Sequence, residues 1–399
     1  MTHYRQWSAA FGSYFTILGL WTAFGPGTLM ATSPRAAPLA LAAMTLAYFV
    51  ATPCVRMLWQ RLGFARTLAL MGAGVGLSLA CAALAPQWLA VCAPLAFFFG
   101  SGSYTLCETR LLEDLAHSGQ GHRFGRARKW GSFGFLAAAS LGGAVFSLGG
   151  VGPSFGLALG LCGLVYFGCC LALARAVAQA PNPVQIASAA TAAAAAPAPL
   201  AIDSATKANG SGPTVSATDS PRQRWWGTCA ISGLRLGETI STTWFGAYWL
   251  STGHGPLQTG LLCALPVAAE FWALWRGAAL LARFSTERLM LLCCVLSALR
   301  WWATPLCESL WCAVPLQAMH AFSFGLFYPA SLIWLQAAFA DNFFQARYLS
   351  ESLTRALSAA VSFAAASWVI LQWGHGALFA LSGALAAAAA LWWWRVARP

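Results

Sequence analysis

The chain has 399 residues, of which 59% are Ala, Val, Ile, Leu, Met, Phe, Trp, Tyr or Cys and only 9% are charged. An ordinary soluble domain has about a quarter charged residues, so this chain lacks the polar groups to cover a water-soluble globule. Its net charge of +12 is not gathered into a basic block that could follow a phosphate backbone. The composition excludes a nucleic-acid-binding module and indicates a protein that is solvated by a lipid bilayer.

Long apolar segments follow one another along the chain. A helix needs about 20 mostly apolar residues to cross the hydrocarbon core of a bilayer. Twelve segments meet this requirement: 9–31, 37–59, 67–85, 88–110, 130–149, 153–174, 226–250, 257–281, 288–305, 310–335, 348–371 and 376–394. They are too long and too continuously apolar for the alternating strands of a membrane β-barrel. We therefore expect an all-α membrane protein with twelve transmembrane helices.

The basic residues outside these spans lie on one side of the predicted membrane. If the N-terminus is cytoplasmic, the opposite side has few basic residues other than Arg35. The residues on the cytoplasmic side are then Arg5, Arg61, Arg66, Arg123, Arg126, Arg128, Lys129, Arg175, Lys207, Arg222, Arg224, Arg283, Arg288, Arg347, Arg395 and Arg398. Cytoplasmic loops of membrane proteins are enriched in Lys and Arg. We therefore expect an inner-membrane protein with both termini in the cytoplasm.

Residues 176–224 interrupt the series of spans. Ala, Pro, Ser, Thr and Gly dominate this segment, which cannot bury enough apolar area to offset its chain entropy. We expect a disordered cytoplasmic linker between an N-terminal six-helix bundle, 1–175, and a C-terminal six-helix bundle, 225–399. Two such halves are the architecture of the major facilitator superfamily, in which the substrate binds between the halves near the middle of the bilayer.

Motifs for enzymatic chemistry are absent from the sequence. None of the thirteen cysteines forms a Cys-x-x-Cys pair, and we interpret them as small packing residues. No phosphate-binding loop, dinucleotide fingerprint or nucleophile elbow occurs. We expect no metal, no cofactor and no enzymatic activity. Uphill transport must then draw on an ion gradient, and the expected partners of a monomeric carrier are a small-molecule substrate, protons and the bilayer.

A few ionisable side chains lie inside the predicted spans, where a charge is kept only if it faces a cavity or a partner. Arg235 and Glu238 are three residues apart, so they either neutralise each other along one helix or have separate roles. Glu270 and His320 have no oppositely charged residue within four positions. A buried carboxyl or imidazole can load and release a proton. Both are candidate proton-coupling residues, and a structural histidine bonded to a neighbouring hydroxyl is the alternative for His320.

Residues 123–135, "RFGRARKWGSFGF", lead into the fifth predicted span. This stretch resembles the signature found there in the lactose permease and phenylpropionate permease branches of the major facilitator superfamily. The lactose permease has nearly the same FGRAR run, and the phenylpropionate type has a Tyr-Gly-x-x-Arg-x-Trp-Gly-Ser version. The resemblance continues at "VAAEFW" around Glu270, "ALRWW" around Arg300 and "LQAMHAFSF" around His320. It implies a proton symporter.

The resemblance also implies a substrate site that is shared by both halves. In lactose permease-like symporters, a glutamate of span four pairs with an arginine of span five at the sugar site, and Glu108 and Arg128 are similar to these residues. The span-eight glutamate, the span-nine arginine and the span-ten histidine of the family match Glu270, Arg300 and His320.

Three positions depart from the family pattern. Phe135 stands where the lactose permease has the tryptophan on which galactosides stack, and Ser323 stands where it has the carboxylate that carries the coupled proton. Glu238 occupies a position where phenylpropionate-type members tend to have histidine. The first two changes count against a galactoside symporter, and Glu238 is a further candidate for the substrate site.

These observations predict proton-coupled import of a small organic solute such as an aromatic, phenylpropionate-like acid. Arg128 or Arg300 would hold its carboxylate, because a guanidinium makes bidentate, charge-assisted bonds to a planar anion. The candidates to pack against its ring are Trp130, Phe135, Tyr248 and Trp249. The alternatives are a nucleoside or sugar proton symporter and a drug or metabolite exporter of the same fold.

Overall fold

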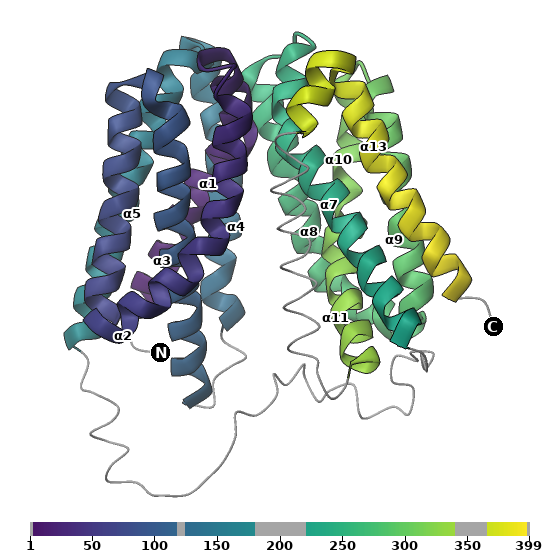
Figure 1. The fold of residues 1–399 in the computed structure, drawn as a ribbon, viewed down its shortest axis with the longest axis horizontal. Helices are drawn as coiled ribbons and strands as arrows, with labels where there is room; N and C mark the ends of the chain where they lie inside the picture. Colours follow the sequence, from purple (N-terminus) through teal and green to yellow (C-terminus); the bar gives the residue numbers. More distant parts are fainter. Residues whose placement is uncertain (1–2, 118–123, 180–220, 340–364, 397–399) are drawn as a thin grey trace, which may run out of the picture.

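The computed structural model describes residues 3–117, 124–179, 221–339 and 365–396. Nearly all of these residues are helical, and these ranges contain no β-strand. Figure 1 shows two helical bundles side by side, the N-terminal one in purple and blue and the C-terminal one in green and yellow. This arrangement agrees with the all-α fold class that the sequence predicts.

The N-terminal bundle contains all of the first six predicted spans. Its helices are α1 (Tyr4–Thr32), α2 (Ala37–Leu84), η1 (Pro86–Trp88), α3 (Leu89–His117), α4 (Phe124–Gly149) and α5 (Val151–Gln179). Helix α2 comprises two predicted spans, which Gly63 separates with a φ of 77° and a ψ of 169°. A residue with a Cβ rarely adopts this conformation, so Gly63 permits the chain to reverse between the two spans.

The C-terminal bundle is less regular. Its helices are α7 (Pro221–Ser251), α8 (Pro256–Arg283), α9 (Thr286–Ala303), η4 (Thr304–Leu306), α10 (Leu310–Ala318), η5 (Ala321–Leu326), α11 (Phe327–Ala338) and α13 (Ala366–Val396). The tenth predicted span is therefore divided, with the π-helix η5 between α10 and α11. Such π-helical segments are frequent at functional sites.

Two predictions fall largely outside the described residues. They are most of the eleventh span, 348–371, and residues 180–220 of the predicted linker. The last residues of the eleventh span form the start of α13, and Gly374, with a φ of 76° and a ψ of 175°, separates them from the twelfth.

Several helices in the described part of the chain have the length and composition of membrane spans. Among the described residues, seven helical segments are long and apolar enough to cross a membrane: 49–84, 86–115, 126–149, 154–179, 286–306, 310–338 and 366–396. Helices α1 and α7 are not among these segments. They lie where the bundles meet and contact each other, as α4 and α8 do. The lower hydropathy of α1 and α7 fits a position that faces the other half of the protein as well as lipid.

The two bundles approach most closely at one end, away from the chain termini; we call it the distal end, and the other the terminal end (Figure 1). A Cβ on Gly246 of α7 would lie 2.2 Å from the carbonyl oxygen of Ala23 in α1, and one on Gly260 of α8 would lie 2.1 Å from that of Ala139 in α4. These glycines allow direct contact between helix backbones. The structure is therefore tightly closed at the distal end.

A disulfide also lies at the distal end. It joins Cys307 and Cys312 in the connection from η4 to α10. The other eleven cysteines are free. The interpretation of all cysteines as packing residues is therefore wrong for this pair, whose separation of five residues is not a recognised motif.

Candidate functional site

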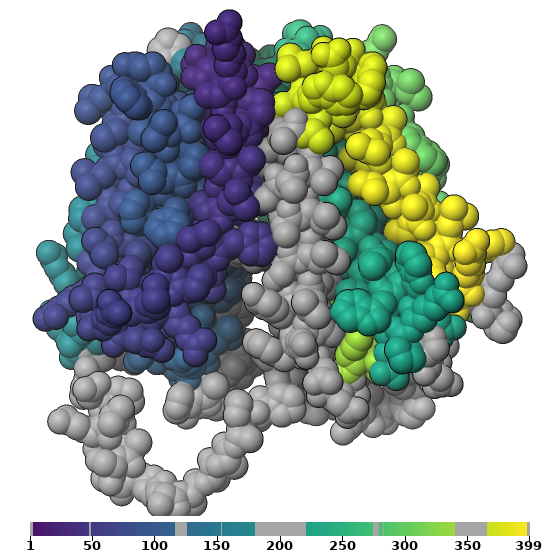
Figure 2. Space-filling model, in the orientation of Figure 1, coloured from purple at the N-terminus to yellow at the C-terminus, as the bar shows by residue number. Residues whose placement is uncertain are grey.

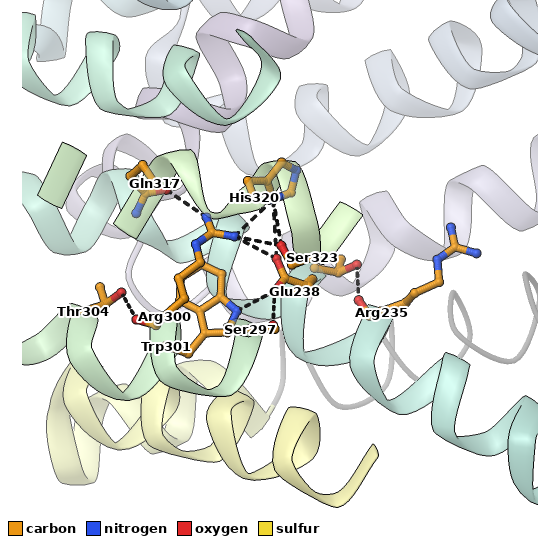
Figure 3. A network of polar contacts seen from close by, with 10 residues as sticks. Arg235, Glu238, Ser297, Arg300, Trp301, Thr304, Gln317, His320 and Ser323 are labelled. Atoms are coloured by element: carbon orange, nitrogen blue, oxygen red, sulfur yellow. Dashed lines mark hydrogen bonds and ion pairs between the residues drawn. The ribbon is translucent and has the colours of Figure 1, made fainter. Parts of the chain in front are cut away.

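A buried polar network lies in the C-terminal bundle, between α7, α9 and the divided tenth span (Figure 3). At its centre, Arg300 Nη1 lies 3.0 Å from Glu238 Oε2. Arg300 is 0% exposed and Glu238 is 5% exposed. Because removing one partner of such a pair leaves an uncompensated buried charge, each of these residues requires the other.

Both carboxylate oxygens of Glu238 accept hydrogen bonds. Ser297 Oγ and Trp301 Nε1 donate to Oε1, the latter at 2.9 Å. Arg300 donates to Oε2. Glu238 thus pairs with an arginine of another helix, whereas Arg235 of its own helix points away from it, with its guanidinium 5.5 Å from the centre of the Tyr328 ring.

Arg300 joins three elements of the bundle. Besides Glu238, it donates through Nη2 to Gln317 Oε1 at 2.9 Å and through Nη1 to Ser323 Oγ at 3.3 Å. Its guanidinium also lies over the Trp301 ring, 4.1 Å from the ring centre, in cation–π geometry. The planar fork of an arginine can serve several acceptors at once, so Arg300 holds α7, α9 and the tenth span together.

His320 is the residue of this network whose hydrogen bonding changes with its protonation state. Its Nδ1 lies 3.1 Å from Arg300 Nη1, which can only donate, and 3.5 Å from Glu238 Oε2, which accepts when ionised. An unprotonated Nδ1 can accept from Arg300, whereas a protonated Nδ1 can donate to Glu238. Ser323 Oγ, 3.5 Å away, is a third neighbour. His320 therefore lies beside both a hydroxyl, as the structural alternative expects, and a buried ion pair.

A second polar cluster lies in the N-terminal bundle. Tyr104 of α3 donates its hydroxyl to Glu108 Oε1 at 2.8 Å and accepts from Arg128 Nε at 3.2 Å. The guanidinium of Arg128 stacks over the Phe15 ring, 4.2 Å from its centre. Glu108 and Arg128, which the family resemblance pairs, are therefore connected through Tyr104. The sequence signal for Tyr104 is its position one helical turn before Glu108.

Glu270 lies on α8, between the two clusters. Arg128 of the N-terminal bundle is close enough to interact electrostatically with its carboxylate. Within the described ranges, the carboxylate of Glu270 has no hydrogen bond or salt bridge. The π-helix packs against its backbone, because a Cβ on Gly325 would lie 3.2 Å from Glu270 Cα. Glu270 of the C-terminal half is thus within electrostatic range of Arg128 of the N-terminal half.

The aromatic residues proposed as ring contacts have varied surroundings. Trp130 is exposed, and its indole donates to the Tyr4 hydroxyl at 3.1 Å. Tyr248 and Trp249 are buried, and Trp249 stacks on His254 with ring centres 3.9 Å apart. Phe135 is half-buried, and its backbone packs against Gly19 of α1.

Comparisons with known proteins agree with this architecture. The sequence model of the MFS_1 like family matches residues 33–369. No curated protein matches the chain in sequence.

Solved transporter structures share the fold over the whole chain. The crystal structure of the nucleoside transporter NupG is 15% identical with a TM-score of 0.75, covering 100% of both chains. An auto inhibited POT family peptide transporter is 14% identical with a TM-score of 0.66, covering 99% of this chain and 97% of that one. A D-xylose-proton symporter is 12% identical with a TM-score of 0.65, covering 99% and 98%.

These likenesses confirm the predicted two-bundle transmembrane fold, while the phenylpropionate permease branch remains a prediction. At such identities the solved structures establish the fold alone, and the family match covers most of the chain. The chain therefore belongs to the MFS_1 like family and is a membrane transporter of the major facilitator superfamily.

Proposed function

We propose that the protein is a proton-coupled carrier that imports a small organic anion across the inner membrane, with an aromatic, phenylpropionate-like acid as the first candidate. The observation that carries this proposal is the environment of Arg128. Its Nε is bound by Tyr104 and one of its faces by Phe15, so the guanidinium is held in place near Glu270 of the other half. A fixed guanidinium is suited to bind a carboxylate through two nitrogens.

Arg128 is a better carboxylate ligand than Arg300 in this conformation. Arg300 is fully buried and already serves Glu238, Gln317 and Ser323. A substrate anion would have to displace those acceptors. We therefore assign the substrate carboxylate to Arg128 and a coupling role to the Glu238–Arg300–His320 network.

Coupling to protons follows from competition for Arg128. An ionised Glu270 is attracted to Arg128 and opposes the approach of a second carboxylate. A proton on Glu270 removes that opposition, so proton binding favours anion binding and the two cross together.

In the other cluster, a proton on His320 turns an acceptor facing Arg300 into a donor to Glu238 and places two positive groups side by side. Each protonation thus favours a different arrangement of the bundles.

The direction of access follows from the orientation that we propose. The excess of Lys and Arg at the terminal end argues for a cytoplasmic location of both termini. The Cys307–Cys312 disulfide at the distal end suits an oxidising compartment. Closure at the distal end would then make this an inward-facing conformation, and transport would proceed by rocking of the two halves.

The alternative is a nucleoside or sugar proton symporter. Two of the solved structures that share the fold are a nucleoside transporter and a D-xylose-proton symporter. Glu108 and Arg128, joined through Tyr104, could also hydrogen-bond the hydroxyls of such a neutral solute. This alternative requires no carboxylate on the substrate. The following experiment decides between an organic anion and a neutral solute by the compound that is added.

The first test measures external pH in a lightly buffered, de-energised suspension of expressing cells. We expect alkalinisation when phenylpropionate is added, and none in a Glu270→Gln variant, because the neutral amide cannot exchange a proton. The matched control is Glu308→Gln, which neutralises an exposed carboxyl at the distal end. Alkalinisation with a nucleoside or a sugar alone would establish the alternative. No response to any solute, with the protein present in the membrane, would contradict symport of all three.

Orientation has a separate test. In intact cells carrying Cys81→Ser, which removes an exposed cysteine near the distal end, a membrane-impermeant maleimide should label the protein only after an impermeant reductant opens the Cys307–Cys312 disulfide. A Cys307→Ser variant should be labelled at Cys312 without reductant. Labelling that requires cell lysis in both cases would place the distal end in the cytoplasm and reverse the proposed topology.

A further inference from the structure

The terminal ends of α7 and α13 lie side by side (Figures 1 and 2). Two adjoining pockets lie between them. The first, of about 440 Å³, is lined by Arg222, Gln223, Trp226, Trp392 and Arg395. The second, of about 400 Å³, shares Trp226, Trp392 and Arg395 and extends toward the middle of the bundle. Together they form one groove, which we call the α7–α13 groove.

The outer part of the α7–α13 groove is basic. Arg222 comes from the first turn of α7 and Arg395 from the last turn of α13, and both are exposed. Neither has a carboxylate partner in the part of the chain that the structure describes. Two guanidinium groups on one pocket present a set of donors that matches a phosphate group in both charge and geometry.

The inner part of the groove is apolar. Beyond the two tryptophans its lining includes Cys229, Ala230, Gly233, Leu385, Ala388 and Ala389. Gly233 faces open space, since a Cβ built there meets no heavy atom within 4 Å. The Trp226 and Trp392 rings, with centres 6.1 Å apart, lie between the basic and apolar parts. Tryptophan favours this position at a membrane–water interface.

We propose that the α7–α13 groove binds an anionic phospholipid, with the phosphate on Arg222 and Arg395 and an acyl chain along Gly233 and Ala389. A basic pocket that continues into an apolar groove on the outer surface of a membrane bundle fits this amphipathic ligand, whereas a soluble phosphate compound would use the basic part alone. The orientation proposed above places the groove in the cytoplasmic leaflet, where anionic headgroups are attracted to basic residues. Bound lipid would link α7, which carries Glu238, to α13.

The test titrates the purified full-length protein in a neutral detergent with dioleoylphosphatidylglycerol, dioleoylphosphatidylcholine or inorganic phosphate and measures bound lipid by native mass spectrometry. Phosphatidylglycerol should be retained and phosphatidylcholine should not. The Arg222→Gln/Arg395→Gln variant should bind phosphatidylglycerol about twenty-five-fold more weakly, since each basic residue near an anionic surface contributes about a five-fold factor. The matched control, Arg283→Gln/Arg288→Gln, removes two exposed arginines from the same end of the bundle and should bind normally.

A second variant tests the acyl part of the groove. A Cβ at Gly233 meets no heavy atom within 4 Å, so Gly233→Leu should place its side chain in the open space and weaken phosphatidylglycerol binding while both arginines remain. Equal binding of the two lipids, or equal loss in the test and control arginine variants, would overturn the proposal. Displacement of phosphatidylglycerol by millimolar inorganic phosphate, together with normal binding to Gly233→Leu, would assign the site to a soluble phosphate compound instead.

Discussion

An Arg300→Gln variant is expected to lose substrate uptake and to unfold at a clearly lower temperature than the wild type. The substitution leaves Glu238, which is 5% exposed, without its counter-charge and removes donors from Gln317 and Ser323. Breaking a buried ion pair in this way costs about 3–5 kcal/mol of folding free energy. Thermal unfolding followed by tryptophan fluorescence in detergent, together with uptake into cells, measures both effects.

A double variant separates stability from coupling. In Glu238→Gln/Arg300→Gln no buried charge is left unpaired, so we expect much of the lost stability to return. Coupled uptake should stay absent, because His320 no longer lies between a fixed donor and an ionised acceptor. Recovery of proton-coupled uptake along with stability would contradict the coupling role and leave the network with a structural one.

A charge-conserving variant adds a third comparison. Arg300→Lys keeps the positive charge beside Glu238, but a single ammonium cannot bond Glu238, Gln317 and Ser323 in the geometry of the guanidinium. We expect intermediate stability and strongly reduced uptake. Wild-type uptake in this variant would show that only the charge matters.

The sequence identified the charged members of the network but not their arrangement. An ionisable side chain inside an apolar span is a candidate functional residue, and this criterion identifies Glu238, Arg300 and His320. Which of them meet is decided by helix packing, and the local spacing of Arg235 and Glu238 left a different pair equally open. The neutral members Ser297, Trp301 and Gln317 were missed, because such residues are common in helices and carry no charge to mark them.

The fold was more predictable than the site for a physical reason. A backbone in lipid must satisfy its own hydrogen bonds, so long apolar segments become helices whatever their tertiary contacts. The breaks in those helices are harder to predict. The chain has 38 glycines, yet among the described residues only Gly63, Gly150, Gly253 and Gly374 have a positive φ. The π-helix of the tenth span, which brings Ser323 to Arg300, has no sequence signal either.

A Gly260→Leu variant is expected to prevent the bundles from closing at the distal end. A Cβ there would lie 2.1 Å from the backbone oxygen of Ala139, and a helix backbone cannot move aside as a flexible side chain can. Overpacking of this kind costs about 1–3 kcal/mol, which disfavours the closed conformation about 5- to 150-fold. Uptake should fall correspondingly, since alternating access requires closure of each end in turn.

Cys263 provides the readout for this variant, because it is buried one turn below Gly260 on the same helix face. Separation of the bundles should raise the rate at which a bulky maleimide labels Cys263 in the detergent-solubilised protein. The control is Gly168→Leu, at an exposed position where a Cβ meets no heavy atom within 4 Å; its labelling and uptake should be unchanged. Normal uptake and protected Cys263 in Gly260→Leu would mean that the glycine-mediated contact is not required in the transport cycle. Faster labelling with normal uptake would mean that distal closure does not limit transport.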